Sequence, residues 1–206
     1  MRIVSFLNPK GGSGKTTSVI NVGSCLARSG KRVAVVDTDP QMSVTNWSKA
    51  EKSAFDVYTA SSEKDVYQVR KELSDYDYVI IDGAGSLSVI TSAGVMVSDL
   101  VIIPVSPSPL DFSATGSVVD VLEAQAYNRP VEARFLITRK IEQATMLGVL
   151  KESIAQTKIP LFRTAITQRQ SYIKSILEGE SVFESNDNAA KGEIEILTRE
   201  IVNLFE

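Results

Sequence analysis

The sequence predicts an α/β fold in which a mostly parallel, twisted sheet is flanked by helices, and it predicts a single domain over residues 1–206. Short apolar runs alternate with stretches of helical spacing, as in repeated strand-helix-strand units. The runs VIIDG and LVIIPV are apolar at successive positions rather than at every second one. Such runs are typical of strands that helices cover on both faces.

The same alternation assigns the elements in order. Strands are expected at Ile3–Leu7, Val33–Val36, Tyr78–Ile81, Leu100–Pro104 and Ala133–Ile137. Helices are expected at about Gly14–Arg28, Met42–Lys52, Glu63–Leu73, Leu87–Val97, Phe112–Tyr127 and Thr145–Thr157, and Gly30 is expected to stop the first of them. Near the C-terminus, Ile194, Leu197, Ile201 and Leu204 recur at helical spacing, so this segment is expected to pack onto the body.

Composition excludes several classes of chemistry. The chain has no histidine, which rules out Ser/His/Asp triads and histidine-bound zinc. Cys25 is the only cysteine, so no disulfide or iron–sulfur cluster can form within one chain, and a core position is expected for it. The 22 basic and 25 acidic side chains nearly cancel, so any surface for DNA or a membrane must be local. The run of five apolar or small residues after Met1-Arg2 is too short for a secretory or membrane segment, so a cytoplasmic protein is expected.

The string KGGSGKTT at 10–17 lies between the first expected strand and the first expected helix. Glycine-rich turns in this position hold polyphosphate with backbone N–H groups, while a lysine contacts the outer phosphates and a hydroxyl coordinates Mg²⁺. Lys15 and Thr16 fit those two roles. The strict G-x-x-x-x-G-K-[ST] pattern fails because Pro9 stands at its first glycine. A turn beside two solvated lysines would not account for the flanking strand and helix.

This string resembles the deviant Walker A loop of the ParA/MinD group of ATPases, within the P-loop NTPase fold. The resemblance implies a catalytic role for two lysines: Lys15 in its own site, and Lys10 at the nucleotide of the opposite subunit in an ATP-bound homodimer. It also implies that the phosphates of ATP are bound by Gly11, Gly12, Ser13, Gly14, Lys15, Thr16 and Thr17.

Two carboxylates follow the second expected strand, in VVDTDPQ. Asp37 and Asp39 are two positions apart, so in an extended segment both can project to one side, which suits a metal ion and a water molecule. The resemblance implies that Asp37 lies near Mg²⁺ and that Asp39 is catalytic, orienting or deprotonating the attacking water. The alternative is that one of these aspartates caps the helix expected to begin near Met42.

A third carboxylate, Asp82, ends the apolar strand in YVIIDGAG and is expected to bind Mg²⁺ through water, as a Walker B residue does. The expected metal set is therefore Thr16, Asp37 and Asp82. Gly83, Ala84 and Gly85 stand where many relatives have prolines. Because strand carboxyl ends form the ligand-binding edge of such sheets, these motifs together predict binding of ATP or GTP.

The choice of ATP comes from the resemblance, and two segments are expected around its base. They are the pair Thr138-Arg139, which follows a strand, and the PVSPSP segment at 104–109.

The resemblance covers essentially the whole chain, including SPLDF, FLITR and FRTAITQRQ, and is strongest to the small ParF-type plasmid-partition ATPases. It implies an ATPase that is weak alone and stimulated by a separate centromere-binding adaptor. It also implies a dimer that binds double-stranded DNA non-specifically on the nucleoid and that is compatible with polymers.

One stretch supports DNA binding without reference to a family. Between residues 153 and 177 there is no acidic residue, and four basic residues are present: Lys158, Arg163, Arg169 and Lys174. We call these four residues the basic strip. Such a strip can bind phosphates through charge and counterion release. The alternative is an ordinary solvated helix face.

Other functions stay open or are disfavoured. A membrane-binding relative would need a basic amphipathic C-terminal helix, but KGEIEILTREIVNLFE carries more acid than base, so no membrane partner is expected. An iron-protein reductase would need cluster cysteines. A metabolic synthetase or kinase of the dethiobiotin-synthetase type is the alternative from another class, and an ATPase that positions protein cargo is the nearest rival. The fold alone does not decide among them.

Overall fold

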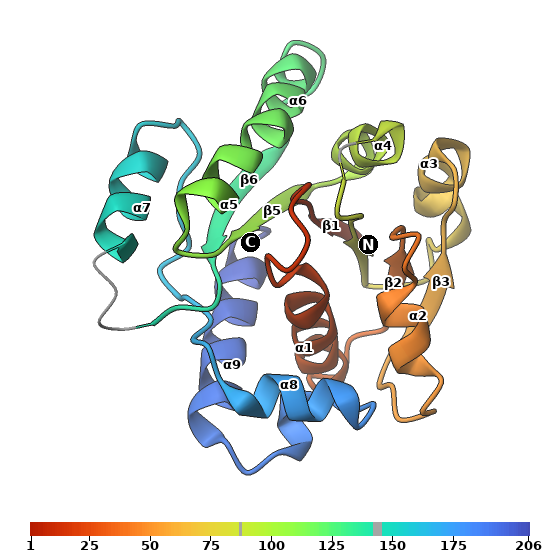
Figure 1. The fold of residues 1–206 in the computed structure, drawn as a ribbon. Coiled ribbons are helices and arrows are strands. Elements are labelled where there is room, and N and C mark those ends of the chain that lie inside the picture. Colours follow the sequence, from red (N-terminus) through yellow and green to blue (C-terminus); the bar gives the residue numbers. More distant parts are fainter. Residues whose placement is uncertain (87, 142–145) are drawn as a thin grey trace.

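The computed structural model describes residues 1–86, 88–141 and 146–206, and its centre is a sheet of six parallel strands in the order β3-β2-β4-β1-β5-β6 (Figure 1). The strands are β1 (Arg2–Phe6), β2 (Val33–Asp37), β3 (Asp56–Thr59), β4 (Tyr78–Asp82), β5 (Leu100–Val105) and β6 (Glu132–Ile137). The helices are α1 (Lys15–Arg28), α2 (Ser43–Ser48), α3 (Glu63–Glu72), α4 (Val89–Val97), α5 (Pro109–Ala114), α6 (Gly116–Ala126), α7 (Met146–Ala155), α8 (Gln170–Leu177) and α9 (Asn188–Asn203), with a 3₁₀ turn, η1, at Val182–Glu184.

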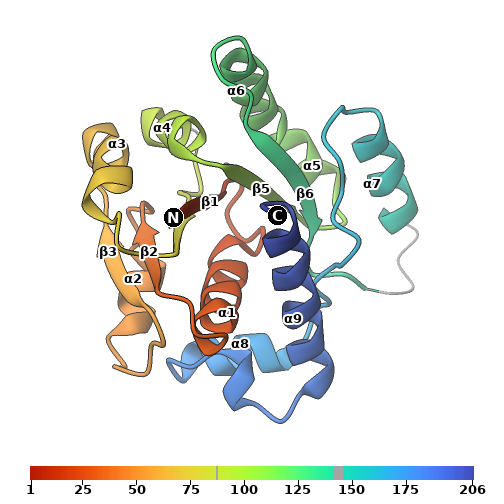
Figure 2. The same cartoon turned by 180° about the vertical axis from the view of Figure 1, so that it is seen from behind.

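Helices cover both faces of the sheet, as the continuous apolar strands predict. Helices α1 and α9 pack on one face, and α3, α4 and α6 pack on the other (Figures 1 and 2). Side chains alternate along β1: Val4 and Phe6 enter the core under α1 and α9, whereas Ile3 enters the core under α3 and α4. The α/β prediction with a mostly parallel sheet is confirmed.

Residues 160–167 extend the sheet beyond β6. The amides of Phe162 and Ile166 donate to the carbonyls of Phe135 and Ile137, each at 2.9 Å. On the outer side, the Glu200 carboxylate of α9 accepts the amide of Arg163 at 2.9 Å. This edge of the sheet is therefore satisfied by a helix that comes later in the chain, which limits its tendency to pair with another strand.

Most predicted elements are present within a few residues, and the exceptions have physical causes. Strand β3 was not predicted, because Asp56–Thr59 is short and largely exposed at the sheet edge and so lacks an apolar run. The single helix predicted at Phe112–Tyr127 is wrong. The chain forms α5 and α6, which meet at Thr115, and the Thr115 amide and hydroxyl both donate to the carbonyl of Phe112.

Several boundaries also differ. Helix α2 ends at Ser48 rather than Lys52. The predicted helix starts at Leu87 and Thr145 lie outside the described residues. Gly30 adopts φ 83°, the left-handed conformation that ends α1 as predicted.

Helix α8 was not predicted as a separate helix, whereas the C-terminal packing prediction is confirmed. Ile194, Leu197 and Ile201 of α9 are fully buried against α1 and the sheet. Cys25 is half-buried and packs against the same core. Across the described ranges, no helix is both long enough and apolar enough to span a bilayer.

Candidate functional site

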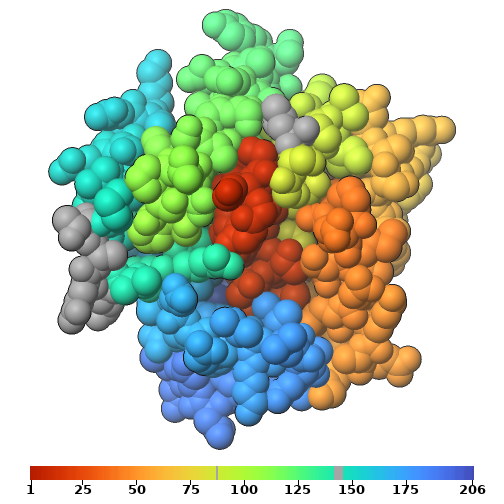
Figure 3. Space-filling view, viewed as in Figure 1, coloured from red at the N-terminus to blue at the C-terminus, as the bar shows by residue number. Residues whose placement is uncertain are grey.

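The loop between β1 and α1 lies at the centre of one face of the molecule, where Figure 3 shows it in red between α5 and α2. Gly12 and Gly14 have φ values of 77° and 87°, which other residues rarely adopt, so both glycines are required by the backbone. Asn8 fixes the start of the loop: its Nδ2 donates to the carbonyl of Pro104 at 2.6 Å, and its Oδ1 accepts the amide of Lys10 at 2.8 Å. Sequence reasoning missed Asn8, although its place directly before the glycine motif was a usable signal.

The pair Thr138-Arg139 lies directly against this loop. The Thr138 hydroxyl donates to the carbonyl of Ser13 at 2.7 Å. A Cβ at Gly14 would lie only 3.1 Å from the Cβ of Thr138, and a Cβ at Gly12 would lie 3.6 Å from the Arg139 guanidinium. The end of β6 therefore forms one wall of the glycine loop.

A cavity of about 250 Å³ opens beside this wall. It is lined by Gly14, Thr17 and Ser18 on one side, and by Thr138, Arg139 and parts of the segment 166–173 on the other. Its position next to the first turn of α1 suits the base and ribose of a nucleotide. None of the described lining residues comes from the PVSPSP segment, so only Thr138-Arg139 of the two predicted base-binding segments adjoins this cavity.

Lys15 is buried within the loop, with 5% of its surface exposed, and its Nζ donates to the carbonyl of Lys10 at 3.1 Å. Burial lowers the pKa of Lys15, and the nearby carboxylates of Asp82 and Asp39 oppose that shift. A buried ammonium group in a glycine loop is suited to an anionic ligand, because phosphate oxygens would replace the carbonyl that it now contacts. The Lys10 side chain, by contrast, is exposed to solvent.

Thr16 and Asp82 join the loop to the end of β4. The Thr16 hydroxyl donates to Asp82 Oδ2 at 2.8 Å. Asp82 is completely buried, and its Oδ1 has no hydrogen-bond partner among the described residues. Burial raises the pKa of Asp82 to about 7, while the Thr16 hydrogen bond acts in the opposite direction. A buried carboxylate with a free oxygen is suited to a cation, since a positive charge would favour its ionised form.

Asp37 is adjacent to Asp82 because the two residues are partners in the register of β2 and β4. Asp37 Oδ2 accepts the amide and the hydroxyl of Thr45, each at 2.9 Å, and thereby anchors the start of α2. Of the two aspartates, Asp37 is therefore the one whose side chain accepts a backbone amide in the first turn of α2, as the helix-capping alternative expects. Asp39 is half-buried, and its Oδ1 accepts the amide of Gln41 at 2.9 Å in a tight turn.

The predicted metal residues Thr16, Asp37 and Asp82 thus lie together at one sheet edge. In the part of the chain that the structure describes, no group of three or more Asp, Glu, His or Cys side chains could hold a metal by itself. The hydroxyl of Thr16 and the carboxylates of Asp37 and Asp82 fit Mg²⁺, because protein sites usually bind this ion through one or two carboxylates together with substrate phosphates.

Gly83 explains the departure from the proline-containing pattern after Asp82. Its amide donates to the carbonyl of Phe6 at 3.0 Å. A Cβ at Gly83 would lie 2.7 Å from the Phe6 oxygen and 2.6 Å from Leu7 Cδ2, closer than real contacts allow. The chain leaving β4 is therefore pressed against β1, and this holds the Asp82 backbone beside the glycine loop.

The sequence between residues 153 and 177 contains no acidic residue, but in the folded chain acidic side chains from outside this stretch contact members of the basic strip. Arg169 Nη2 lies 2.9 Å from Glu193 Oε1, and Arg169 Nη1 lies 3.7 Å from Asp187 Oδ2. Lys174 lies 3.9 Å from Glu178, one helical turn away. Acids of the helix α9 region thus fold onto the Arg169 end of the strip, which a local count of charges could not reveal.

The other two members of the strip differ from Arg169 and Lys174. Lys158 and Arg163 are both exposed, and no ion pair found among the described residues involves either side chain. The structure therefore divides the four predicted residues by ion pairing: Arg169 and Lys174 have a carboxylate within 4 Å, although the side chain of Lys174 is 75% exposed, and no such pair is found for Lys158 or Arg163 among the described residues.

The parallel sheet, the glycine loop before α1 and the buried lysine, threonine and aspartate at the strand ends define a nucleotide-binding protein of the P-loop NTPase fold. Residues 4–182 match the family model of the CobQ/CobB/MinD/ParA nucleotide binding domain. The match covers most of the chain, and the protein belongs to this family.

Three similar proteins illustrate the relationship. The Maintenance of carboxysome distribution protein A of Halothiobacillus neapolitanus is 29% identical over 207 residues, with 97% of this chain and 95% of that protein covered. Protein ParA of Rhizobium radiobacter is 27% identical over 181 residues, covering 84% and 81%. A putative plasmid partition protein of Borrelia burgdorferi, solved with bound AMPPNP, has the same fold, with a TM-score of 0.76, 19% identity and coverage of 98% and 99%.

Proposed function

We propose that this protein is an ATP-dependent DNA partition protein. It binds ATP with Mg²⁺, and in that state two copies form a sandwich dimer that binds double-stranded DNA non-specifically. A separate centromere-binding adaptor stimulates an otherwise weak hydrolysis of ATP to ADP and phosphate, which releases the DNA. The convergence of Lys15, Thr16 and Asp82 at one sheet edge supports the nucleotide site. The partition role is supported by the similarity to Protein ParA of Rhizobium radiobacter, which covers 84% of this chain.

The nucleotide and its metal ion would be held by residues that already face one another. The loop amides from Gly11 to Thr17 and the Lys15 ammonium bind the phosphates, while Thr16, Asp37 and Asp82 hold Mg²⁺, the carboxylates acting through water. When bound, the ion would neutralise part of the negative charge on the phosphates. Asp39 orients the attacking water, and its half-buried position beside Asp37 keeps it within reach of this site.

The second lysine of the loop explains why a dimer is part of the proposal. Lys10 is exposed, whereas Lys15 is buried within its own loop. Figure 3 shows the N-terminal segment that contains the loop at the surface of one face. A second copy placed against that face would bring its nucleotide within reach of the exposed Lys10 side chain. ATP would then join the two subunits, and the DNA-binding charges of both would act together.

We propose that the basic strip binds DNA and that its four residues contribute unequally to the contact. Lys158 and Arg163 are exposed and can contact phosphates directly. Arg169 and Lys174 are already paired with carboxylates, so a phosphate would have to compete with those partners. We therefore assign the larger share of DNA contact to Lys158 and Arg163. Localisation on the nucleoid, in the cytoplasm, is part of the same proposal.

A second candidate is an ATPase that positions protein cargo with the same DNA-binding switch. The observation that favours it is the relative from Halothiobacillus neapolitanus, whose name refers to carboxysome distribution and which aligns with 97% of this chain. A metabolic synthetase or kinase that transfers phosphate to a small acceptor is the alternative from another class. Both candidates share the nucleotide site, so DNA binding and its partner must distinguish them.

The test is binding to random-sequence duplex DNA with ATP and with ADP over a salt series. Lys158→Glu is the strip variant, because Arg169→Glu would place a third carboxylate beside Asp187 and Glu193 and disturb the fold as well. Lys64→Glu, at an exposed position on α3, is the matched control. Lys15→Ala tests the dependence on nucleotide binding.

We expect ATP-selective binding that weakens steeply with salt and falls at least about threefold in Lys158→Glu at low salt. The Lys64→Glu control should bind as the unmodified protein does, and Lys15→Ala should lose both nucleotide binding and ATP-selective DNA binding. Absence of DNA binding in every nucleotide state would reject the partition function and favour the metabolic enzyme. Normal ATP affinity in Lys15→Ala would reject the nucleotide site itself.

A further inference from the structure

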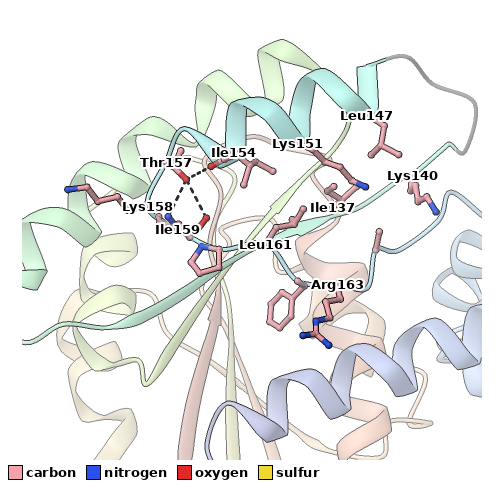
Figure 4. A pocket seen from close by; sticks show the side chains of 14 residues that line it. Ile137, Lys140, Leu147, Lys151, Ile154, Thr157, Lys158, Ile159, Leu161 and Arg163 are labelled. Atoms are coloured by element: carbon pink, nitrogen blue, oxygen red, sulfur yellow. Dashed lines mark hydrogen bonds between the residues drawn. The ribbon is translucent and has the colours of Figure 1, made fainter.

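A groove of about 600 Å³ lies between α7 and the segment 157–165, on the side of the chain beyond β6 (Figure 4). Helix α7 contributes Leu147, Lys151 and Ile154, and the facing segment contributes Leu161 and Arg163 among others. The groove shares no lining residue with the cavity beside the glycine loop. It is a separate feature of the surface.

The floor and walls of this groove are apolar. Ile154 and Phe162 are almost fully buried, and Leu147, Ile159 and Leu161 are half-buried beside them. One end is fixed by Thr157, whose hydroxyl donates to the carbonyl of Ile154 at 2.8 Å and accepts the amide of Ile159 at 3.3 Å (Figure 4). The turn from α7 into the facing segment is thus held in place, so the apolar surface is preformed.

The charged residues in the described lining of the groove are all basic. Among its described lining residues there are four basic side chains, Lys140, Lys151, Lys158 and Arg163, and no acidic one. Figure 4 shows Lys158 near one end, next to Thr157 and with its side chain directed outward from the groove, and Lys140 and Leu147 at the other end. The whole chain carries a net charge of −3, so this is a local concentration of positive charge.

Three of these cations are available to a partner. Lys151, Lys158 and Arg163 are exposed, and their side chains enter none of the ion pairs found among the described residues. Within the described ranges, none of the three is held in an ion pair as Arg169 is, although the Glu200 carboxylate accepts the backbone amide of Arg163 at 2.9 Å. An occupant with carboxylates would gain pairing at the rim without displacing a partner from this chain. Lys158 and Arg163 are also the residues to which we assign most DNA contact, so the peptide and DNA would compete for them, whereas Lys151 and the apolar floor would serve the peptide alone.

From this combination we infer that the groove is a docking site for an acidic peptide segment of a partner protein, one with aliphatic or aromatic side chains at its centre and Asp or Glu on both sides. The apolar centre fits the floor formed by Leu147, Ile154 and Leu161, and the flanking carboxylates fit the cationic rim. A DNA backbone satisfies the rim but leaves the apolar floor uncovered, because its phosphates and sugars offer little apolar surface. A peptide covers both.

The experiment is fluorescence anisotropy with the full-length protein and a labelled peptide that has Leu and Phe at its centre and Asp and Glu on either side. A second peptide carries Ser in place of Leu and Phe at the same charge. The protein variants are Lys151→Glu for the rim and Leu161→Ser for the wall, with Lys64→Glu on α3 as the matched charge control. Thermal unfolding of each variant verifies that it is folded.

We expect saturable, salt-sensitive binding of the first peptide, weakened at least about tenfold by Lys151→Glu and by Leu161→Ser, and unchanged in Lys64→Glu. The Ser-containing peptide should bind at least about tenfold more weakly. Equal binding of the two peptides, or an unchanged affinity in both groove variants, overturns the proposal. Displacement of the peptide by short duplex DNA, together with normal peptide binding by Leu161→Ser, would instead identify the groove as a phosphate-binding surface and also overturns it.

Discussion

The indole of Trp47 donates a hydrogen bond of 3.1 Å to the backbone carbonyl of Glu180, which joins α2 to the chain that leaves α8. Trp47 is 6% exposed and stacks on Phe55 with ring centroids 5.5 Å apart. Two residues before Trp47, Thr45 is anchored on Asp37 at the nucleotide edge. The chain therefore has a continuous set of contacts from the proposed metal site, through α2, to the segment that follows α8.

This arrangement predicts that Trp47 reports nucleotide binding. It is the only tryptophan in the chain, so its emission can be assigned without ambiguity. Nucleotide with Mg²⁺ at Asp37 should shift α2 through Thr45 and change the intensity or the maximum of Trp47 emission in a titration with ATP. The Lys15→Ala variant, which lacks the buried ammonium, should show no change. An unaltered emission spectrum at a nucleotide concentration that calorimetry shows to be saturating would contradict the coupling.

The second prediction concerns Asp39. We expect Asp39→Ala to retain ATP binding, because the loop amides and Lys15 are intact, and to lose turnover by about 100-fold or more, as expected for loss of a group that positions or deprotonates water. The measurement is phosphate release at saturating ATP, with nucleotide affinity determined on the same preparation. Undiminished hydrolysis would remove Asp39 from catalysis and leave it the turn-stabilising role seen in its hydrogen bond to Gln41.

The fold and the nucleotide edge were largely predictable because their signals are local. Buried strands give continuous apolar runs, and a glycine loop with a lysine and a hydroxyl has few other uses. The positions of Lys15, Thr16 and Asp82 therefore followed from the sequence and the order of the strands. Strand β3 has no such signal, since Asp56–Thr59 is exposed at the sheet edge.

What could not be predicted depends on contacts between distant parts of the chain. Arg169 looked free because the acids that pair with it, Asp187 and Glu193, come later in the sequence. The groove beside α7 was missed for the same reason: Lys151 and Arg163 approach one cavity only after the chain folds back along β6. Charge patterns read along the sequence describe a surface only where the surface is built from one segment.

The third prediction tests the close approach at Gly83. A Cβ there would meet the Phe6 carbonyl at 2.7 Å and Leu7 Cδ2 at 2.6 Å, and the backbone carbonyl cannot move without disturbing β1. We expect Gly83→Ala to lower the free energy of unfolding by about 1 to 3 kcal/mol, as overpacking in a core does. Chemical denaturation measures the change. Gly116→Ala is the control, since nothing lies within 4 Å of a Cβ at Gly116. Equal stability of the two variants would show that the chain after Asp82 can move away from β1.

The last prediction concerns pH and the cap of α9. Asp187 Oδ1 accepts the amide of Ala190 at 3.0 Å, and Oδ2 accepts the Ser171 hydroxyl at 2.8 Å. The Ala190 hydrogen bond is the main reason that the pKa of Asp187 lies below its usual value of 3.8, and Arg169 adds to the shift. Because the folded-state pKa is lowered, the ionised carboxylate stabilises the fold above the unfolded pKa, and this contribution is lost as the pH falls through the folded pKa.

Asp187→Asn keeps a capping oxygen but cannot ionise. We therefore expect it to be less stable than the unmodified protein by about 0.3 to 1 kcal/mol at neutral pH, the range for a charge at a helix N-terminus. The difference should shrink below about pH 4 and vanish once Asp187 is protonated in both states. Denaturation at a series of pH values measures this, with the exposed Asp75→Asn as a control that should show no such trend. A stability difference that stays constant down to the acid limit would mean that the cap acts through geometry and not through its charge.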